Sequence, residues 1–408
     1  MRLLLLLLGM IVQLPLGWHF FYAQDGTLRE TEHFDDDIVP AADQFYKYYD
    51  FIKGKRLGLV VNHTSRVGEV HLVDTLLKMD CQIQKIFAPE HGFRGKADAG
   101  EKLKDGVDAR TGIPIVSLYG KNRKPNSEQF KNLDLVIFDI QDVGARFYTY
   151  TSTMTYIMEA CSENKVPLLI LDRPNPNGHY VDGPILEKEQ ASFVGLHPVP
   201  IVHGLTVAEY ARMINGEGWL ENGVKCELHH VECLNYNHQK FYQLPIKPSP
   251  NLPNMQSIYL YPSLCLFEGT TVSVGRGTTK QFQIYGHPAC SKGSHTFKPV
   301  PREGAKRPKH NGKSCKGYDL TTMPIATLQK QTQLQMEHVC NFYQELSSGE
   351  QKDFFLSTNF FDLLAGNTNL QEQVKNKASI AAIRKTWEPQ LIAYKKLRKK
   401  YILYKDFE

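Results

Sequence analysis

A glutamate and a histidine directly follow a run of apolar residues that is typical of a buried strand. The run from Ile83 to Phe87 continues into Ala88-Pro89-Glu90-His91-Gly92-Phe93-Arg94-Gly95. In an open α/β sheet, ligands bind in the crevice beyond the carboxyl ends of the strands. A glutamate between Pro89 and Phe93 would be partly desolvated, which suits a general acid. We therefore predict that Glu90 is catalytic; the alternative is a surface carboxylate paired with Arg94.

Polar clusters also follow three other runs that read as strands. They are Asn62-His63-Thr64-Ser65, the segment from Asp139 to Tyr150, and Asp172-Arg173-Pro174-Asn175. One acidic strand end is often only a helix cap, but the carboxyl ends of parallel strands share one edge of a sheet, where clefts form. We predict that these clusters meet at one cleft, with Asp142 or Asp139 as the second carboxylate. Both can face the cleft only if the chain becomes helical after Gln141.

Further candidate binding residues combine aromatic, amide and charged side chains. Tyr148 and Tyr150 could stack on a pyranose ring, although isolated aromatic residues more often belong to a core. In the C-terminal half, Glu268 is a third candidate for the second carboxylate. Arg276 lies between two glycines and could either bind a carboxylate in a fork or be solvated in a turn. The polar side chains predicted to bind substrate at the strand ends are His91, Asn62, Arg94, Gln141, Arg146, Asp172, Arg173 and Asn175.

Short apolar runs alternate with amphipathic segments from residue 56 onward. Strands are predicted at 57–61, 83–88, 115–119, 135–138 and 167–171, and helices at 70–79, 127–130 and 154–162. Near-continuous apolar strands separated by helices indicate a parallel sheet that is covered on both faces.

The 408 residues exceed what one hydrophobic core usually organises. We therefore expect the α/β class, with a Rossmann-like catalytic domain over residues 40–195 and a second, smaller α/β domain over residues 196–408. In the second domain, Thr206 and Glu209 form a capping box before a helix. A strand is expected at 224–231, and helices at 318–345 and 370–404.

The first 24 residues are typical of a secretory signal peptide. Arg2 precedes an apolar run from Leu3 to Leu8, and the small residues Gly17 and Ala23 follow. The apolar segment is too short to span a bilayer. We expect an exported protein, periplasmic or extracellular, without a stable membrane span.

The eight cysteines include no Cys-x-x-Cys pair, so zinc and thioredoxin-type sites have no support. Buried thiols are favoured for Cys81, Cys161 and Cys265. Cys290 and Cys315 lie at the two ends of one segment. In an exported protein, a disulfide between them and two free thiols are equally expected.

The net charge of +5 is concentrated in residues 287–317, which hold eight lysines and arginines but one acid, Glu303, and so carry +7, leaving about −2 for the rest of the chain. Proline, glycine and serine are frequent there, which favours a solvated surface loop. The alternative is attraction to an anionic polymer such as cell wall. Nucleic acid is not expected, because no recognisable module accompanies these charges.

Several enzyme classes lack their motifs. The chain has no Gly-x-Ser-x-Gly elbow, no His-Glu-x-x-His, and no dinucleotide fingerprint after its first strand. His229 and His230 are adjacent in a strand-like run, so they point to opposite faces and cannot share a metal ion. We expect neither a metal nor a cofactor.

Several blocks of the chain resemble the exo-β-N-acetylmuramidase family over about residues 40–408. They are Glu90 to Gly95, Asp139 to Tyr150, Asp172 to Pro176, His203 to Thr206, Ser249 to Pro253, Glu268 to Thr270 and Gly275 to Thr278. The resemblance implies a Rossmann-like domain joined to a smaller α/β domain, with the active cleft between them. It places the proposed catalytic glutamate on Glu90 and adds His203 and Asn251 as binding candidates. The basic segment 287–317 departs from the family, and no function is carried onto it.

The resemblance and the acidic strand ends together predict an exo-acting glycoside hydrolase. Its substrates would be muropeptides or glycans that end in N-acetylmuramic acid. One of Arg94, Arg146, Arg173 or Arg276 would bind the lactyl carboxylate of that sugar. Retaining, inverting and substrate-assisted mechanisms all stay open. Two alternatives are a non-catalytic muropeptide-binding protein and an amidohydrolase or deacetylase acting on the same sugar.

Overall fold

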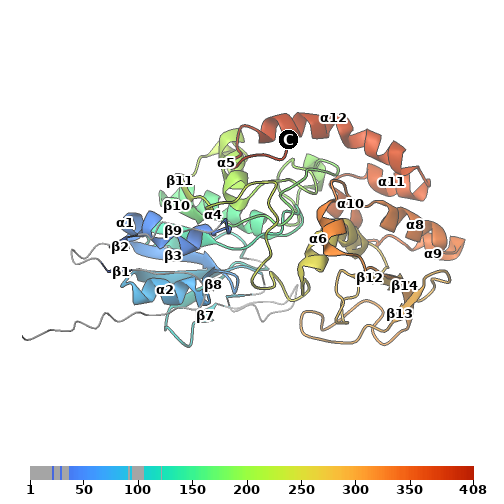
Figure 1. The fold of residues 1–408 in the computed structure, drawn as a ribbon, viewed down its shortest axis with the longest axis horizontal. Helices are drawn as coiled ribbons and strands as arrows, with labels where there is room; N and C mark the ends of the chain where they lie inside the picture. Colours follow the sequence, from blue (N-terminus) through green and yellow to red (C-terminus); the bar gives the residue numbers. More distant parts are fainter. Residues whose placement is uncertain (1–20, 23–27, 30–35, 91, 94–104, 121) are drawn as a thin grey trace, which may run out of the picture. The chain divides into compact units, whose positions relative to one another are not determined.

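The computed structural model describes residues 21–22, 28–29, 36–90, 92–93, 105–120 and 122–408 (Figure 1). Residues 1–37 and 38–408 form two separate units. In the first unit, β1 (Phe21–Tyr22) pairs with β2 (Leu28–Arg29) in antiparallel orientation. Most of the predicted signal peptide lies outside the described residues, so it stays a prediction. In the part of the chain that is described, no helix has both the length and the apolar character needed to cross a bilayer.

A seven-stranded sheet organises the first part of the second unit. Its strands lie in the order β11-β10-β9-β3-β6-β8-β7. All neighbours are parallel except β7, which runs antiparallel to β8 at one edge. The bounds are β3 (Arg56–Val61), β6 (Gln82–Ala88), β7 (Gly106–Val107), β8 (Pro114–Ser117), β9 (Leu135–Asp139), β10 (Leu168–Leu171) and β11 (Leu228–Val231). The predicted parallel α/β sheet is confirmed.

Helices cover both faces of this sheet because its central strands are apolar on both sides. On one face, Leu57 and Leu59 of β3 share a core cluster with Leu76 of α2 (Leu72–Lys78). On the other face, Val60 of β3 shares a cluster with Met154 of α4 (Tyr150–Asn164). Alternate residues of a strand point to opposite faces, so one apolar run supplies two cores.

Helix α5 (Val207–Glu217) precedes the edge strand β11, and its start confirms the predicted capping box. The Thr206 hydroxyl accepts from the Glu209 backbone amide at 3.4 Å, and the Glu209 carboxylate accepts from the Thr206 amide at 2.8 Å. The domain boundary between residues 195 and 196 stays a prediction. The central sheet takes its edge strand β11 from beyond that point.

A smaller region with its own sheet follows α6 (Met255–Leu264). Its three antiparallel strands lie in the order β12-β14-β13, with bounds β12 (Ile284–His287), β13 (His295–Phe297) and β14 (Cys315–Asp319). Figure 1 shows α8, α9 and α10 gathered near this sheet. The remaining helices are α1 (Tyr49–Ile52), α3 (Ser127–Phe130), α7 (Ile325–Gln329), α8 (Glu337–Glu345), α9 (Ser348–Lys352), α10 (Phe360–Ala365), α11 (Asn369–Lys375) and α12 (Ile380–Arg398).

Three expectations for the smaller region need correction. The helix expected at 318–345 is divided, because β14 extends to Asp319 and only α7 and α8 are helical beyond it. The basic segment 287–317 is more than a loop, because it contains β13 and the beginning of β14. The disulfide considered for Cys290 and Cys315 is not formed, and both thiols are free and buried. They pack in different places: Cys315 lies against Ile284 and Phe297, whereas Cys290 belongs to the large core cluster.

Candidate active site

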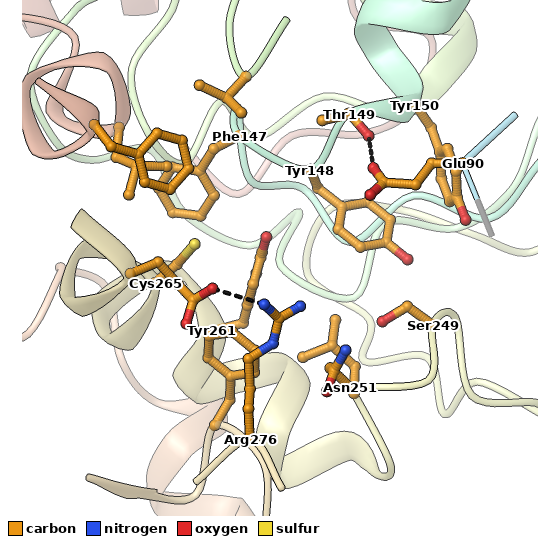
Figure 2. Close-up of a pocket in the computed structure, with 16 residues that line it drawn as sticks. Glu90, Phe147, Tyr148, Thr149, Tyr150, Ser249, Asn251, Tyr261, Cys265 and Arg276 are labelled. Carbon is orange, nitrogen blue, oxygen red and sulfur yellow. Dashed lines mark hydrogen bonds and ion pairs between the residues drawn. The ribbon is translucent and has the colours of Figure 1, made fainter. Parts of the chain in front are cut away.

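A pocket lies between the loop after β6, the start of α4 and the segments that surround α6. It holds about 780 Å³ of space, part of it open to solvent. Sixteen residues line it: Glu90, Phe147, Tyr148, Thr149, Tyr150, Val194, Ser249, Asn251, Leu252, Tyr261, Cys265, Glu268, Arg276, Phe282, Phe360 and Leu364 (Figure 2). Six of the predicted site residues therefore meet here: Glu90, Tyr148, Tyr150, Asn251, Glu268 and Arg276.

Glu90 enters the pocket from the turn that ends β6. The Gly92 amide donates to the Pro89 carbonyl at 3.0 Å, and Gly92 has a φ of +75°, which favours glycine. The Glu90 side chain is half-buried, and its Oε2 accepts a hydrogen bond from the Thr149 hydroxyl at 3.0 Å. Thr149 occupies the position before α4 without capping the helix through its side chain. That hydroxyl is therefore used to hold the carboxylate of Glu90.

Aromatic rings form the wall beside Glu90. Tyr148 and Tyr150 meet edge to face at 4.9 Å between ring centroids, and Tyr148 and Tyr261 at 5.9 Å. The Tyr148 hydroxyl donates to the Pro248 carbonyl at 2.9 Å, so the ring is tied to the neighbouring turn. Burial raises the pKa of Tyr150, and the Glu90 carboxylate raises it further. Tyr150 therefore stays protonated. Its ring lines the pocket and also belongs to the large core cluster.

Arg276 and Glu268 form an ion pair in the pocket wall, with 2.9 Å between Nη1 and Oε2. Burial lowers the pKa of Arg276, but Glu268, other nearby groups and Glu90 outweigh this effect and raise it. Two glycines fix the backbone on either side: Gly275 has a φ of +76° and Gly277 a φ of +83°. A Cβ at Gly275 would come within 2.6 Å of Ile284, so the loop needs glycine there.

The aspartates predicted as second carboxylate are not among the residues that line the pocket. Asp139 is fully buried, and its two oxygens accept from Arg173 at 2.5 and 2.9 Å. Asp142 is buried and accepts from the Gly144 amide at 2.7 Å, while burial raises its pKa to about 7. The segment after Gln141 is not helical. The condition for both aspartates to face one cleft is therefore not met.

Other predicted binding residues, also absent from the pocket lining, connect parts of the fold. Asp172 accepts from the Tyr404 hydroxyl at 2.6 Å and from the Ala208 amide at 3.0 Å. Arg146 donates four hydrogen bonds, of 2.7–2.9 Å, to backbone carbonyls at positions 184, 199, 364 and 365. Such buried polar side chains satisfy backbone groups that would otherwise be unpaired.

The amide and imidazole side chains predicted at strand ends and in later turns are similarly engaged. Asn62 accepts from the Thr64 amide at 2.8 Å, and Gln141 donates to the Pro174 carbonyl at 2.8 Å. The Asn175 amide donates to the carbonyl of residue 205 at 2.9 Å. Burial lowers the pKa of His203 to about 3, so this imidazole is neutral. His91 and Arg94 lie outside the described residues.

Sequence reasoning missed several lining residues because they come from distant segments. Tyr261 lies on α6 and Phe360 begins α10, about a hundred residues further along the chain. Thr149 lies within the block Asp139 to Tyr150 that was predicted to reach the cleft. Its position directly before a helix is the feature of the sequence that could have identified it as a site residue. No group of three or more His, Cys, Asp or Glu side chains in the described residues is arranged to hold a metal ion.

Comparison with known proteins agrees with this architecture. The family model "Exo-beta-N-acetylmuramidase NamZ, N-terminal" matches residues 57–256, and the corresponding C-terminal model matches residues 259–404. The peptidoglycan beta-N-acetylmuramidase NamZ of Bacillus subtilis (strain 168) is 39% identical over 380 residues, which cover 88% of this chain and 89% of that protein.

Two crystal structures of DUF1343 family proteins from Bacteroides fragilis NCTC 9343 are also similar. One has a TM-score of 0.83 and 44% identity, covering 91% of this chain and 99% of its own. The other has a TM-score of 0.77 and 28% identity, covering 91% of this chain and 100% of its own.

Proposed function

This chain belongs to the exo-beta-N-acetylmuramidase NamZ family, and from that premise we propose that it is an exo-acting glycoside hydrolase. Its reaction is the release of terminal N-acetylmuramic acid from peptidoglycan fragments. The substrate class follows the name of the Bacillus subtilis relative, which is a peptidoglycan beta-N-acetylmuramidase.

The observation that carries the proposal is the position of Glu90. Its carboxyl group lines the pocket, is held by the Thr149 hydroxyl, and lies beside the rings of Tyr148 and Tyr150. Aromatic rings suit the apolar faces of a pyranose, and a fixed carboxyl group can reach the glycosidic oxygen.

The chemistry assigned to Glu90 is general acid catalysis. Its proton goes to the glycosidic oxygen as the bond from that oxygen to C1 of the muramic acid breaks. The remaining glycan leaves with a hydroxyl group, and water supplies the hydroxyl that C1 gains and the proton that Glu90 recovers. Among the described acidic residues, Glu268 also lines the pocket, but its carboxylate is paired with Arg276.

Export belongs to the same proposal. Arg2, the apolar run from Leu3 to Leu8, and the small residues that follow have the pattern of a cleaved signal peptide. The protein would then act in the periplasm or outside the cell. N-terminal sequencing of the protein recovered from the exported fraction tests this, and an intact Met1 there would contradict cleavage.

A Glu90→Gln variant tests the catalytic assignment. Glutamine keeps an oxygen that can accept from Thr149 but cannot donate the acid proton. We expect kcat/KM on a chromogenic N-acetylmuramide to fall by roughly 10²–10⁴-fold, while affinity for free N-acetylmuramic acid is retained. Glu303→Gln, in an exposed turn outside this pocket, is the matched control and should keep full activity.

Two other outcomes would decide against this function. Selective binding of the sugar by the unmodified protein without any turnover would identify a binding protein. Released acetate, with the glycosidic bond intact in mass analysis, would identify a deacetylase. Free N-acetylmuramic acid from the unmodified enzyme is the expected product.

A further inference from the structure

Arg276 has hydrogen-bonding capacity that the protein does not use. Its Nη1 is bound to Glu268, whereas its Nε is buried and has no partner in the part of the chain that the structure describes. The side chain is 28% exposed. Figure 2 shows the guanidinium pointing into the pocket, with one terminal nitrogen turned away from the ion pair. A guanidinium whose second terminal nitrogen is turned into the pocket can donate a charge-assisted hydrogen bond to a carboxylate.

The other described arginines predicted to bind a carboxylate are already engaged. Arg146 donates hydrogen bonds to four backbone carbonyls, and Arg173 is paired with both oxygens of Asp139. Neither lines the pocket. Among these three arginines, Arg276 is therefore the one that can meet a ligand.

The basic segment fixes the loop that carries Arg276. The Val300 amide donates to the Gly277 carbonyl at 3.0 Å. A Cβ at Gly277 would lie 2.8 Å from the ring of Pro308, so the two segments pack backbone against side chain. Residues 300 and 308 thus support the left-handed glycine that follows Arg276.

Lys309 supports the Glu268 side of the ion pair. Its Nζ donates to the carbonyls of Phe267, Glu268 and Thr270 at 3.0, 3.0 and 2.6 Å. These carbonyls belong to the 3₁₀ helix that presents Glu268 and to the residue after it. The other seven cations of the basic segment are exposed, so Lys309 is the one turned inward.

We propose that Arg276 recognises the lactyl carboxylate of N-acetylmuramic acid, with Glu268 and Lys309 as positioning residues that hold its guanidinium. The inference rests on the muramic-acid substrate named in the proposed function. N-acetylglucosamine is the same sugar without the lactyl group, so Arg276 sets the preference between the two.

Calorimetric binding of the two free sugars to full-length variants tests the assignment. We expect the unmodified protein to prefer N-acetylmuramic acid. Arg276→Met should weaken that affinity about 100-fold and leave N-acetylglucosamine affinity within about 2-fold, because a charge-assisted hydrogen bond is lost from the wall. Arg276→Lys should lose about 10-fold, since a lysine keeps the charge but not the planar guanidinium that binds Glu268 through one terminal nitrogen and the ligand through the other. Arg302→Met, an exposed arginine outside this pocket, should change neither affinity.

The positioning roles of Glu268 and Lys309 are tested by the ratio of the affinity for N-acetylmuramic acid to the affinity for N-acetylglucosamine. Glu268→Gln and Lys309→Met should each lower the ratio about 10-fold without a matching loss for N-acetylglucosamine. Lys309→Arg should restore the ratio, because it returns a cationic donor to the carbonyls. A purely structural lysine would instead lower both affinities and the melting temperature together.

An equal loss for both sugars in Arg276→Met, or no loss for either, overturns the assignment. The Arg276→Lys variant decides the question if Arg276→Met does not fold. No selectivity in the unmodified protein also overturns it. Failure of the proposed function looks different: selective, Arg276-dependent binding without turnover would refute the hydrolase and leave this inference standing.

Discussion

Two arginine–carboxylate pairs in this protein share a chemistry but have opposite surroundings. Asp139 and Arg173 are 0% and 4% exposed and are joined by two hydrogen bonds. Glu268 and Arg276 are 17% and 28% exposed and are joined by one. The first pair uses both carboxylate oxygens internally, whereas the second leaves one terminal nitrogen of the guanidinium for a ligand.

The difference arises from what covers each pair. Asp139 ends the central strand β9, and the loop after β3 folds over it: the Gln141 amide donates to the Thr64 hydroxyl at 3.0 Å, and Arg173 also donates to the Arg66 carbonyl at 2.9 Å. The middle of the carboxyl edge is thus filled by the protein itself. The pocket forms to one side, where β6 delivers Glu90. The polar residues at the end of a strand can bind a ligand only where no other loop covers them.

The largest effect expected from this contrast is on stability. Asp139→Asn leaves Arg173 buried without its counter-charge, so the free energy of unfolding should fall by about 3–5 kcal/mol. Urea denaturation measures it. The folded fraction should keep its kcat, because Asp139 does not line the pocket. A loss below about 1 kcal/mol together with lost turnover would mean that Asp139 acts on the substrate.

The next effect, which depends on pH, is expected from Asp142, whose carboxyl pKa burial raises to about 7. Between the ordinary value of 3.8 and about 7, the folded state keeps a proton that the unfolded state releases. This contribution to stability is complete below pH 4 and is lost as the pH rises toward 7, at about 1.4 kcal/mol per pH unit. Asp142→Asn cannot titrate, so the difference in unfolding free energy between variant and unmodified protein should change with that slope. Parallel pH profiles would contradict the buried, protonated state.

The smallest stability effect should come from Glu268→Gln. This partly exposed pair should lose less than about 1 kcal/mol of unfolding free energy. Thermal or urea denaturation of Glu268→Gln beside Asp139→Asn compares the two pairs directly. A loss of several kcal/mol at Glu268 would show that the pocket pair is as structural as the buried one.

Sequence patterns predicted the local structure well where burial on both faces left a strong signal. The apolar runs that became β3, β6, β9 and β10 have no other stable place than the middle of a parallel sheet. Sequence patterns did not predict the secondary structure of short segments that are stabilised by contacts with distant residues. The basic segment 287–317 read as a loop, yet β13 and β14 form there because each pairs with another strand of the smaller sheet.

The sequence by itself determined that Glu90 follows a sheet strand and that Arg276 lies between glycines, since both follow from residue type and order. Only the tertiary structure decided that these two share a pocket while Asp139, Asp142 and Arg173 do not line it. The physical reason is that hydrogen-bond partners such as Thr149 for Glu90, or Lys309 for the carbonyls beside Glu268, come from segments far away in the chain. Spacing along a sequence cannot specify which of several polar strand ends the remaining loops will cover.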